Sequence, residues 1–139
     1  MSEIVIDIRG LSKIYRRGDQ EVAALRGVDL AVPRGEMVTI VGPSGSGKST
    51  LLNLLGCLDR PTSGSYRLAG EDVAGFGPDQ LAEVRHRRIG FVFQGFHLLP
   101  QLTARENVEL PLLFAGLSTR ARRERADELL EMVGLAERM

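Results

Sequence analysis

An eight-residue segment combines glycines, hydroxyl side chains and one lysine in a fixed order. Residues 42–49 read Gly-Pro-Ser-Gly-Ser-Gly-Lys-Ser and match the pattern G-x-x-x-x-G-K-[ST] throughout. Glycines let phosphate oxygens approach backbone N–H groups, because no Cβ stands in the way. Lys48 adds a charge that can reach the outer phosphates, and the Ser49 hydroxyl suits Mg²⁺, which prefers oxygen ligands. These residue types predict a loop that binds the phosphates of ATP.

The elements expected on either side would position this loop. Residues 37–41 form a short apolar, β-branched run, which is typical of a buried strand. Residues 49–58 carry a helical stripe of leucines, so a helix should follow the loop, pack on the sheet and point its positive N-terminal end at the anion. The alternative is a glycine-rich turn that contains a lysine by chance. The full match and its strand–loop–helix context favour phosphate binding.

Other elements follow from periodicity and from start and stop signals. Apolar patterns predict further strands at residues 4–8, 22–32, 65–68 and 89–93. Helices are predicted from Pro78 to about Arg88, after the capping-box pair Thr103 and Glu106, and from Arg120 to a stop at Gly134. The succession of strand, helix and strand predicts an α/β core with a parallel sheet.

Composition limits the classes of function. The 18 basic and 18 acidic side chains cancel, so the chain has no overall field that would collect nucleic acid or anionic lipid. Two arginine clusters, at 85–88 and 120–125, are interspersed with acidic residues and are interpreted as solvated helix faces. Cys57 is the only cysteine, which excludes an internal disulfide, and we expect it to be a small buried residue at a helix end. No secretory signal or stretch of about 20 apolar residues occurs, so we expect a soluble, cytoplasmic chain.

Longer runs around the loop resemble the ATP-binding subunit of ABC transporters. The matching stretches are 42–59, Pro-Thr-Ser-Gly at 61–64, Gly-Phe-Val-Phe-Gln at 90–94, and residues 97–100 and 102–108. The last three look like the branch that contains the macrolide-export and lipoprotein-release ATPases. The resemblance covers the whole chain, from Leu11 to Leu135. It implies a partial P-loop NTPase fold of the α/β class. Residues 1–94 would form the nucleotide-binding α/β core with an N-terminal antiparallel β subdomain, and residues 95–139 the start of a helical subdomain.

The resemblance also implies roles for individual residues. Tyr15 matches the aromatic residue that stacks on adenine, with a plain strand tyrosine as the alternative. Gln94 matches the glutamine that senses Mg²⁺ and the attacking water; outside this context it would be interpreted as a solvated loop residue. Lys48 and Gln94 are the expected catalytic residues, and Ser49 and Gln94 the expected metal contacts. The phosphate contacts are expected from Gly42, Pro43, Ser44, Gly45, Ser46, Gly47, Lys48, Ser49 and Thr50.

Partners follow from the same resemblance. Residues 95–102 match the surface that receives a coupling helix of the membrane permease, and Phe96, Leu98 and Leu99 place apolar side chains there. These three could equally pack beneath the helix that follows Thr103. The expected partners are the permease and a second ATP-binding subunit, with the protein held at the inner face of the cell membrane.

Competing functions remain open at this point. A small P-loop kinase or a GTPase is one alternative, although no Asn-Lys-x-Asp-type guanine motif occurs. A nucleotide-binding module without turnover is another.

The resemblance predicts little hydrolysis by these 139 residues alone. Family members continue with a Leu-Ser-Gly-Gly-Gln signature, a strand that ends in Asp-Glu and a switch histidine, and the sequence contains none of them. The glutamate is the expected general base, and general-base catalysis contributes about 10²–10⁴-fold. We therefore expect very slow ATP hydrolysis in a phosphate-release assay. A Mg²⁺-dependent turnover of about one per second, within the ordinary range for phosphoryl transfer, would contradict this expectation.

Overall fold

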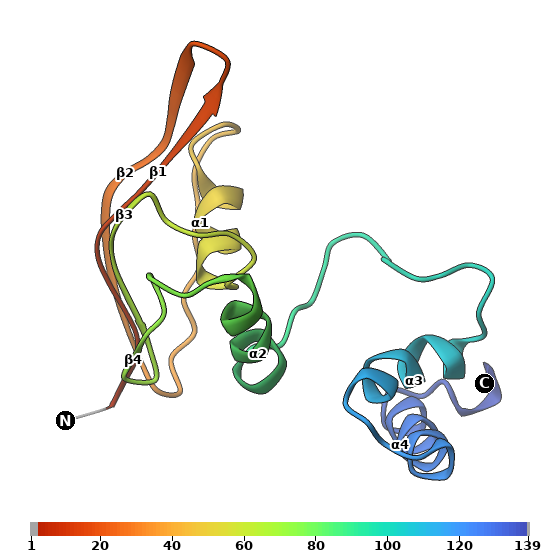
Figure 1. The fold of residues 1–139 in the computed structure, drawn as a ribbon. Helices are drawn as coiled ribbons and strands as arrows, with labels where there is room; N and C mark the ends of the chain where they lie inside the picture. The colour runs from red at the N-terminus through yellow and green to blue at the C-terminus, as the bar shows by residue number, and fades with distance from the viewer. Residues whose placement is uncertain (1–2, 139) are drawn as a thin grey trace. The chain divides into compact units, whose positions relative to one another are not determined.

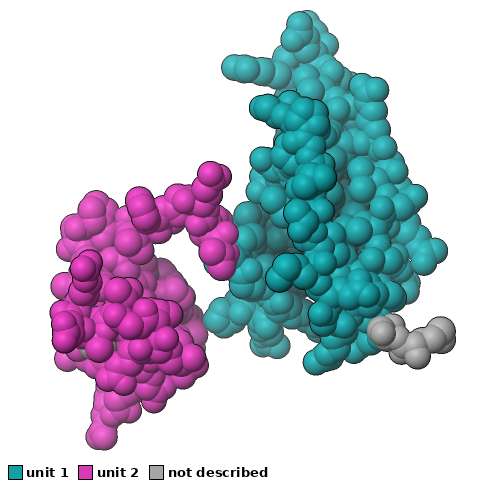
Figure 2. Space-filling view, turned by 180° about the vertical axis from the view of Figure 1, so that it is seen from behind, with its two compact units in different colours: residues 1–91 teal, residues 92–139 magenta. Residues whose placement is uncertain are grey.

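The computed structural model describes residues 3–138 and divides the chain into two compact units. The first comprises residues 1–91 and the second residues 92–139 (Figure 2). The boundary expected from the family resemblance lies after residue 94. Whether the two units correspond to the subdomains of the family stays a prediction.

A four-stranded antiparallel sheet forms one side of the first unit. The strands are β1 (Ile4–Arg17), β2 (Gln20–Pro33), β3 (Ser63–Leu68) and β4 (Glu71–Asp72), in the order β2-β1-β3-β4. The predicted strands near residues 4–8, 22–32 and 65–68 are therefore confirmed, and the first two are longer than expected. The short β4 was not predicted, because two polar residues carry no strand periodicity.

A bulge in β1 decides which of its side chains reach the core. The pairing of β1 with β2 shifts register between Ile8 and Leu11, and Gly10 lies in this interval with a positive φ of 57°. In a regular strand, side chains three positions apart, such as Ile8 and Leu11, would point to opposite faces of the sheet. The extra residue of the bulge turns both side chains to the same face. Ile8 and Leu11 are accordingly both buried. The register of the sheet therefore depends on an irregularity and not on alternation alone.

Two helices cover one face of this sheet (Figure 1). They are α1 (Lys48–Leu55) and α2 (Pro78–Arg88), and both bring side chains to the core that Ile8 and Leu11 share, namely Leu51, Leu54, Leu81 and Val84. The predicted leucine stripe of α1 is only partly buried. Leu52 is 55% exposed because it lies on the face of α1 that is turned away from the sheet, and Leu58 is 49% exposed because α1 ends at Leu55, before it. Cys57 is buried just after α1, as predicted.

The predicted parallel strands at 37–41 and 89–93 are absent. Both segments are irregular, and every strand pair between residues 3 and 138 is antiparallel. A strand needs a neighbouring backbone that supplies its hydrogen bonds, and an apolar sequence cannot replace that partner. Met37, Val41 and Val92 are consequently 95%, 84% and 101% exposed. The expectation of a parallel sheet was wrong for the described residues.

The second unit is a helical pair. It contains α3 (Ala104–Phe114), α4 (Thr119–Met132) and a 3₁₀ turn, Ala136–Arg138 (Figure 1). The capping box is confirmed: the Thr103 hydroxyl accepts the Glu106 N–H at 3.2 Å, and the Glu106 carboxylate accepts the Thr103 N–H at 2.8 Å. Gly134 follows α4 with a positive φ of 75°, as the predicted stop requires. No helix of the described residues is long and apolar enough to span a bilayer.

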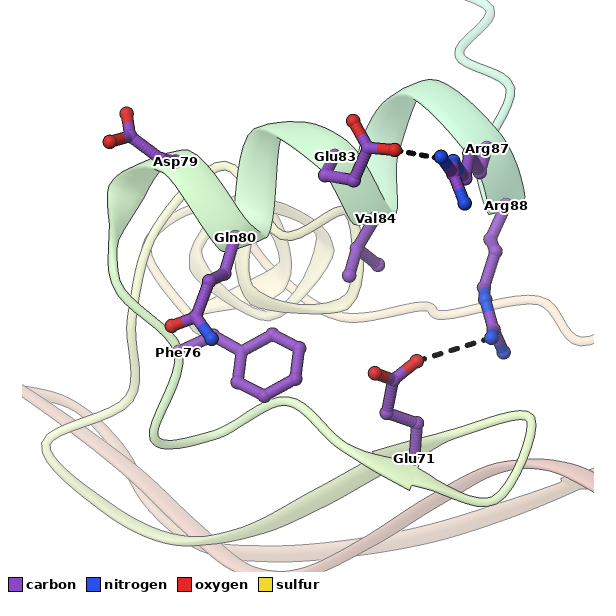
Figure 3. Close-up of a pocket in the computed structure, with 8 residues that line it drawn as sticks. All are labelled: Glu71, Phe76, Asp79, Gln80, Glu83, Val84, Arg87 and Arg88. Atoms are coloured by element: carbon purple, nitrogen blue, oxygen red, sulfur yellow. Dashed lines mark ion pairs between the residues drawn. The ribbon is translucent and has the colours of Figure 1, made fainter.

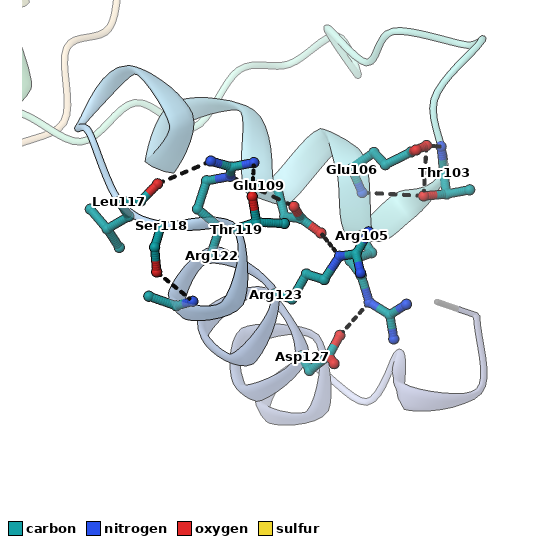
Figure 4. A network of polar contacts seen from close by, with 11 residues as sticks. Thr103, Arg105, Glu106, Glu109, Leu117, Ser118, Thr119, Arg122, Arg123 and Asp127 are labelled. Atoms are coloured by element: carbon teal, nitrogen blue, oxygen red, sulfur yellow. Dashed lines mark hydrogen bonds and ion pairs between the residues drawn. The ribbon is translucent and has the colours of Figure 1, made fainter.

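Ion pairs join the two helices of this unit (Figure 4). Arg105 on α3 pairs with Asp127 on α4 at 2.5 Å. The half-buried Glu109 lies 3.8 Å from Arg122 and 3.9 Å from Arg123. The prediction of a solvated helix face is confirmed for Arg120, Arg123 and Arg125, which are exposed. It is wrong for Arg122, whose side chain is only 17% exposed because it packs towards Glu109 on α3.

Tyr66 links β3 to the end of α1 by a hydrogen bond, and we expect this bond to contribute to stability. The Tyr66 side chain is 2% exposed, and its hydroxyl donates to the Leu55 carbonyl at 2.8 Å. Tyr66→Phe should lower the free energy of unfolding by about 1 kcal/mol at pH 7, because the Leu55 carbonyl loses its donor. Urea unfolding followed by circular dichroism measures this.

The same residue makes stability depend on alkaline pH. Burial raises the pKa of Tyr66 in the folded chain, so folding favours the neutral phenol. Its contribution is complete below about pH 10, the pKa of an unfolded tyrosine, and is lost as the pH rises towards the higher folded pKa. Tyr66→Phe should flatten the alkaline fall in stability, whereas the control Tyr15→Phe should keep most of it. Equal alkaline slopes for Tyr66→Phe and the wild-type chain would contradict the assignment.

Candidate phosphate-binding site

The glycine-rich loop leads directly into α1. Within the loop, the Ser46 N–H donates to the Pro43 carbonyl at 3.2 Å and closes a tight turn. Gly47 is the N-cap of α1, and its carbonyl accepts the Leu51 N–H at 2.9 Å. Lys48 is the first helical residue, one position before the predicted start. The N-terminal N–H groups of α1 therefore open next to the loop, where they can donate to an anion.

Gly47 lies too close to β2 to carry a side chain. A Cβ at this position would lie 2.6 Å from the Ala24 carbonyl oxygen and 3.0 Å from Leu25 Cδ2. Gly47 also has a φ of 96°, which L side chains rarely adopt. The backbone of β2 thus fixes where the loop ends and where α1 begins.

The Lys48 ammonium lies across the loop. Its Nζ donates to the Gly42 carbonyl at 2.5 Å and to the Pro43 carbonyl at 2.7 Å, and lies 3.4 Å from Ser46 Oγ. This places the positive charge beside the backbone that the sequence predicts to surround a phosphate. Phosphate oxygens can accept the same ammonium protons and form stronger, charge-assisted hydrogen bonds.

A cleft of about 550 Å³ opens between the loop, α1 and β2, and Lys48 is one of its lining residues. Ser49 is exposed and lines the cleft. The lining combines loop, helix and strand residues: Val22, Ala23, Ala24, Ser44, Gly45, Gly47, Lys48, Ser49 and Thr50. The structure therefore brings together most of the sequence-predicted phosphate contacts. The three β2 residues were not predicted, because they contribute through position and small size and carry no motif.

The remaining two predicted site residues are outside the loop motif in the sequence. Tyr15, on β1, is 41% exposed, and its hydroxyl donates to the Asp59 carboxylate at 3.0 Å. Gln94 lies in an irregular, exposed segment of the second unit. Its proposed contact with Mg²⁺ and water at the phosphate loop stays a prediction.

A second hollow of about 470 Å³ lies between α2 and β4 (Figure 3). Both of its arginines already have a carboxylate partner, because Arg88 pairs with Glu71 at 3.1 Å and Arg87 pairs with Glu83. A phosphate would compete there with carboxylates for each guanidinium. The Lys48 cleft offers an ammonium held by neutral carbonyls, so we assign phosphate binding to that cleft.

Comparison with known families agrees with this assignment. The family model described as ABC transporter matches residues 25–139. The chain belongs to the ABC transporter family. Residues 42–50 lie within the matched region, and the three β2 residues of the cleft lie just before it. Nucleotide binding by this domain is the family property that the geometry of the loop reflects.

Three curated ABC transporter proteins illustrate the similarity. The macrolide export ATP-binding/permease protein MacB of Nitrosomonas europaea is 56% identical over 97% of this chain and 21% of its own length. The pyoverdine export ATP-binding/permease protein PvdT of Pseudomonas fluorescens is 56% identical over 99% of this chain and 21% of its length. An ABC transporter ATP-binding protein of Thermotoga maritima is 56% identical over 97% of this chain and 58% of its length. The chain thus spans between about a fifth and three-fifths of these relatives.

Two solved structures share the fold. A dimeric, post-hydrolysis structure of the ATP-binding cassette MJ0796 bound to ADP and Pi is 46% identical, with a TM-score of 0.81. A second dimeric structure of MJ0796, described as a bacterial ABC transporter cassette, is 47% identical with the same TM-score. Each match covers 91% of this chain and 56% of the solved one. The partial α/β fold of an ABC ATPase cassette is therefore confirmed.

The contact between Gly47 and β2 generates a prediction for binding. Gly47→Ala should weaken ATP binding at least about tenfold, because the new Cβ must displace the loop from the Ala24 carbonyl and move the Lys48 ammonium with it. Isothermal titration calorimetry measures the affinity.

Gly18→Ala is the matched control for this change. Gly18 also has a positive φ, of 61°, but a Cβ added there would meet nothing within 4 Å. The substitution should cost about 1 kcal/mol of stability through backbone strain and leave ATP affinity unchanged. Equal ATP affinities for Gly47→Ala and Gly18→Ala would refute the importance of the close approach.

Proposed function

We propose that the chain binds ATP together with Mg²⁺ in the cleft between β2 and residues 42–50. The observation that carries the proposal is the Lys48 ammonium, held at the Gly42 and Pro43 carbonyls of a loop that Gly47 anchors to β2. Loop N–H groups and the first turn of α1 would donate to the phosphates, and Lys48 would bind the outer ones. The exposed Ser49 hydroxyl would be a Mg²⁺ ligand, as the oxygen preference of this cation requires.

Hydrolysis would use the same groups for positioning and for charge stabilisation. Phosphoryl transfer needs little covalent chemistry from the protein, so an ammonium beside the transferred phosphate stabilises the charge that develops in the transition state. Lys48 is the residue of this chain that would do so. Gln94 would orient the attacking water and contact Mg²⁺ in the whole protein. This role rests on its position after the segment 89–93 in the family motif.

In the whole protein, ATP would power export through a membrane permease. The relatives MacB and PvdT carry the names of macrolide and pyoverdine export proteins that combine ATP-binding and permease functions. The matched MJ0796 structures are dimeric, which supports pairing with a second ATP-binding subunit. We therefore propose that the protein acts at the inner face of the membrane, in a transporter of the macrolide-export or lipoprotein-release type whose permease selects the substrate.

The segment 95–102 is the surface proposed for the permease. Phe96 and Leu98 are 92% and 61% exposed, which favours a partner-facing surface over packing beneath α3. Asn107 braces this segment from α3. Its side-chain oxygen accepts the Leu99 N–H at 2.8 Å, and its amide group lies 3.2 Å from both the Leu99 and Leu102 carbonyls. The exposed side chains are thus presented on a hydrogen-bonded loop.

Lys48→Ala tests the proposed function. Loss of the ammonium should lower ATP affinity by at least about tenfold, because the site loses its charge-assisted hydrogen bonds to phosphate. Titration with labelled ATP and GTP, with and without Mg²⁺, measures this, and wild-type binding should favour ATP and strengthen with Mg²⁺. Arg34→Ala is the control: Arg34 is an exposed cation that pairs with Glu3 at 3.2 Å, and its loss should leave ATP affinity unchanged. Equal affinity of Lys48→Ala and wild type, or a preference for GTP, would overturn the proposal.

A further inference from the structure

Three side chains meet where β1 passes the turn that follows α1. Tyr15 and Lys13 extend from β1, and Asp59 lies in the turn. The Asp59 carboxylate accepts the Tyr15 hydroxyl at 3.0 Å through Oδ2 and the Lys13 ammonium at 2.8 Å through Oδ1. The two oxygens of one carboxylate therefore fix two neighbouring side chains of the strand.

The arrangement also orients the ring of Tyr15. The Lys13 ammonium lies over the ring, 5.0 Å from its centroid, which is the geometry of a cation–π contact. The Lys13 side chain is only 13% exposed, whereas Tyr15 as a residue is 41% exposed. With one face held by Lys13, the opposite face is the one that a planar ligand could reach.

The turn itself is fastened to β1. The Arg60 carbonyl accepts the Lys13 ammonium at 2.6 Å, and the Arg60 N–H donates to Asp59 at 2.7 Å. One step further along, the Thr62 hydroxyl accepts the Ile14 N–H at 2.9 Å. These bonds stop the turn from moving independently of the strand, so Asp59 is a rigid support for the Tyr15 hydroxyl.

The electrostatics of the cluster keep Asp59 charged. Burial acts to raise the pKa of the Asp59 carboxyl, but hydrogen bonds from Lys13, the Arg60 N–H and Tyr15 together bring it below its usual value. For Tyr15, burial and then the bond to Asp59 raise the pKa of the phenol, while Thr50 opposes the shift. At neutral pH a carboxylate thus accepts from a neutral phenol. Tyr15 pairs across the sheet with Val22, which lines the cleft beside the phosphate loop.

We propose that Asp59 is a positioning residue for the nucleotide base, because it holds the Tyr15 ring at a fixed distance from the phosphate loop. The base stacks on the ring face opposite the Lys13 ammonium. The inference rests on the proposed binding of ATP at residues 42–50, since α1 begins at that loop and ends four residues before Asp59. Asp59 does not touch the nucleotide; it acts through Tyr15.

The test separates base binding from phosphate binding by the choice of ligand. Inorganic tripolyphosphate can bind only to the phosphate loop, whereas ATP can bind to the loop and also stack its base on the Tyr15 ring. Asp59→Ala and Tyr15→Phe each remove the hydrogen bond between these two side chains, one by deleting the acceptor and the other by deleting the donor. Both variants keep an aromatic ring at position 15. Each should weaken ATP binding by roughly three- to tenfold, the cost of ordering one freed side chain on binding, and leave tripolyphosphate affinity unchanged. The double variant should bind ATP about as well as Asp59→Ala alone, because that single variant already lacks the hydrogen bond that Tyr15→Phe removes.

Asp7→Ala is the matched control. Asp7 also lies on β1, pairs with Arg9 at 3.2 Å and has a side chain 30% exposed, close to the 33% of Asp59. Its loss should change neither affinity. Circular dichroism melting of all variants checks that they fold.

Four outcomes would overturn the inference, and some of them would also contradict base binding or the proposed function. Unchanged ATP affinity in Asp59→Ala, or equal losses for ATP and tripolyphosphate, would show that the cluster is only a structural link. Equal binding of ATP and tripolyphosphate by the wild-type chain would show that Tyr15 does not bind the base, but it would leave the phosphate site supported. Absence of any Lys48-dependent binding would remove the proposed function as well.

Discussion

The absence of a side chain at Gly47 lets the first turn of α1 lie directly against the backbone of β2. A Cβ there would come within 2.6 Å of the Ala24 carbonyl oxygen, so the contact fixes the N-terminal end of the helix. The C-terminal end is fixed by two other bonds, from the Tyr66 hydroxyl to the Leu55 carbonyl at 2.8 Å and from Arg85 to the Cys57 carbonyl at 2.6 Å. A helix held at both ends keeps its N-terminal N–H groups, and the Lys48 side chain beside them, in one orientation. The geometry of the phosphate site therefore depends on the contacts that fix both ends of α1.

Features that depend on neighbouring residues could be predicted from the sequence. The Thr103–Glu106 capping box places both partners within one helical turn, and it forms as predicted. The start of α2 at Pro78 and the stop after α4 at Gly134 are equally local. The phosphate loop belongs to this class as well, because eight consecutive residues and the helix that follows them contain nearly all of its groups. Its local character explains why a single sequence could indicate the site.

Features that depend on distant partners could not be predicted. The segments 37–41 and 89–93 have strand-like composition but remain irregular, because composition does not supply a neighbouring backbone. The bulge near Gly10 exists only through the pairing of β1 with β2. Lys13 and Asp59 are 46 positions apart, so no local sequence motif indicates their contact. Even the wall of the cleft comes from β2, whose small residues show no chemistry of their own.

The hydrogen bonds of Lys48 explain how a charged loop can stay folded before a phosphate arrives. An ammonium group loses hydration when it approaches a backbone, and unpaired donors are costly in such a place. The Gly42 and Pro43 carbonyls compensate for that loss at 2.5 and 2.7 Å. Binding then exchanges neutral acceptors for charged ones, so the gain is the difference between the two sets of bonds and not the full attraction of two charges. That difference favours polyphosphates, whose several charged oxygens can replace both carbonyls at once, over an anion that offers a single charge.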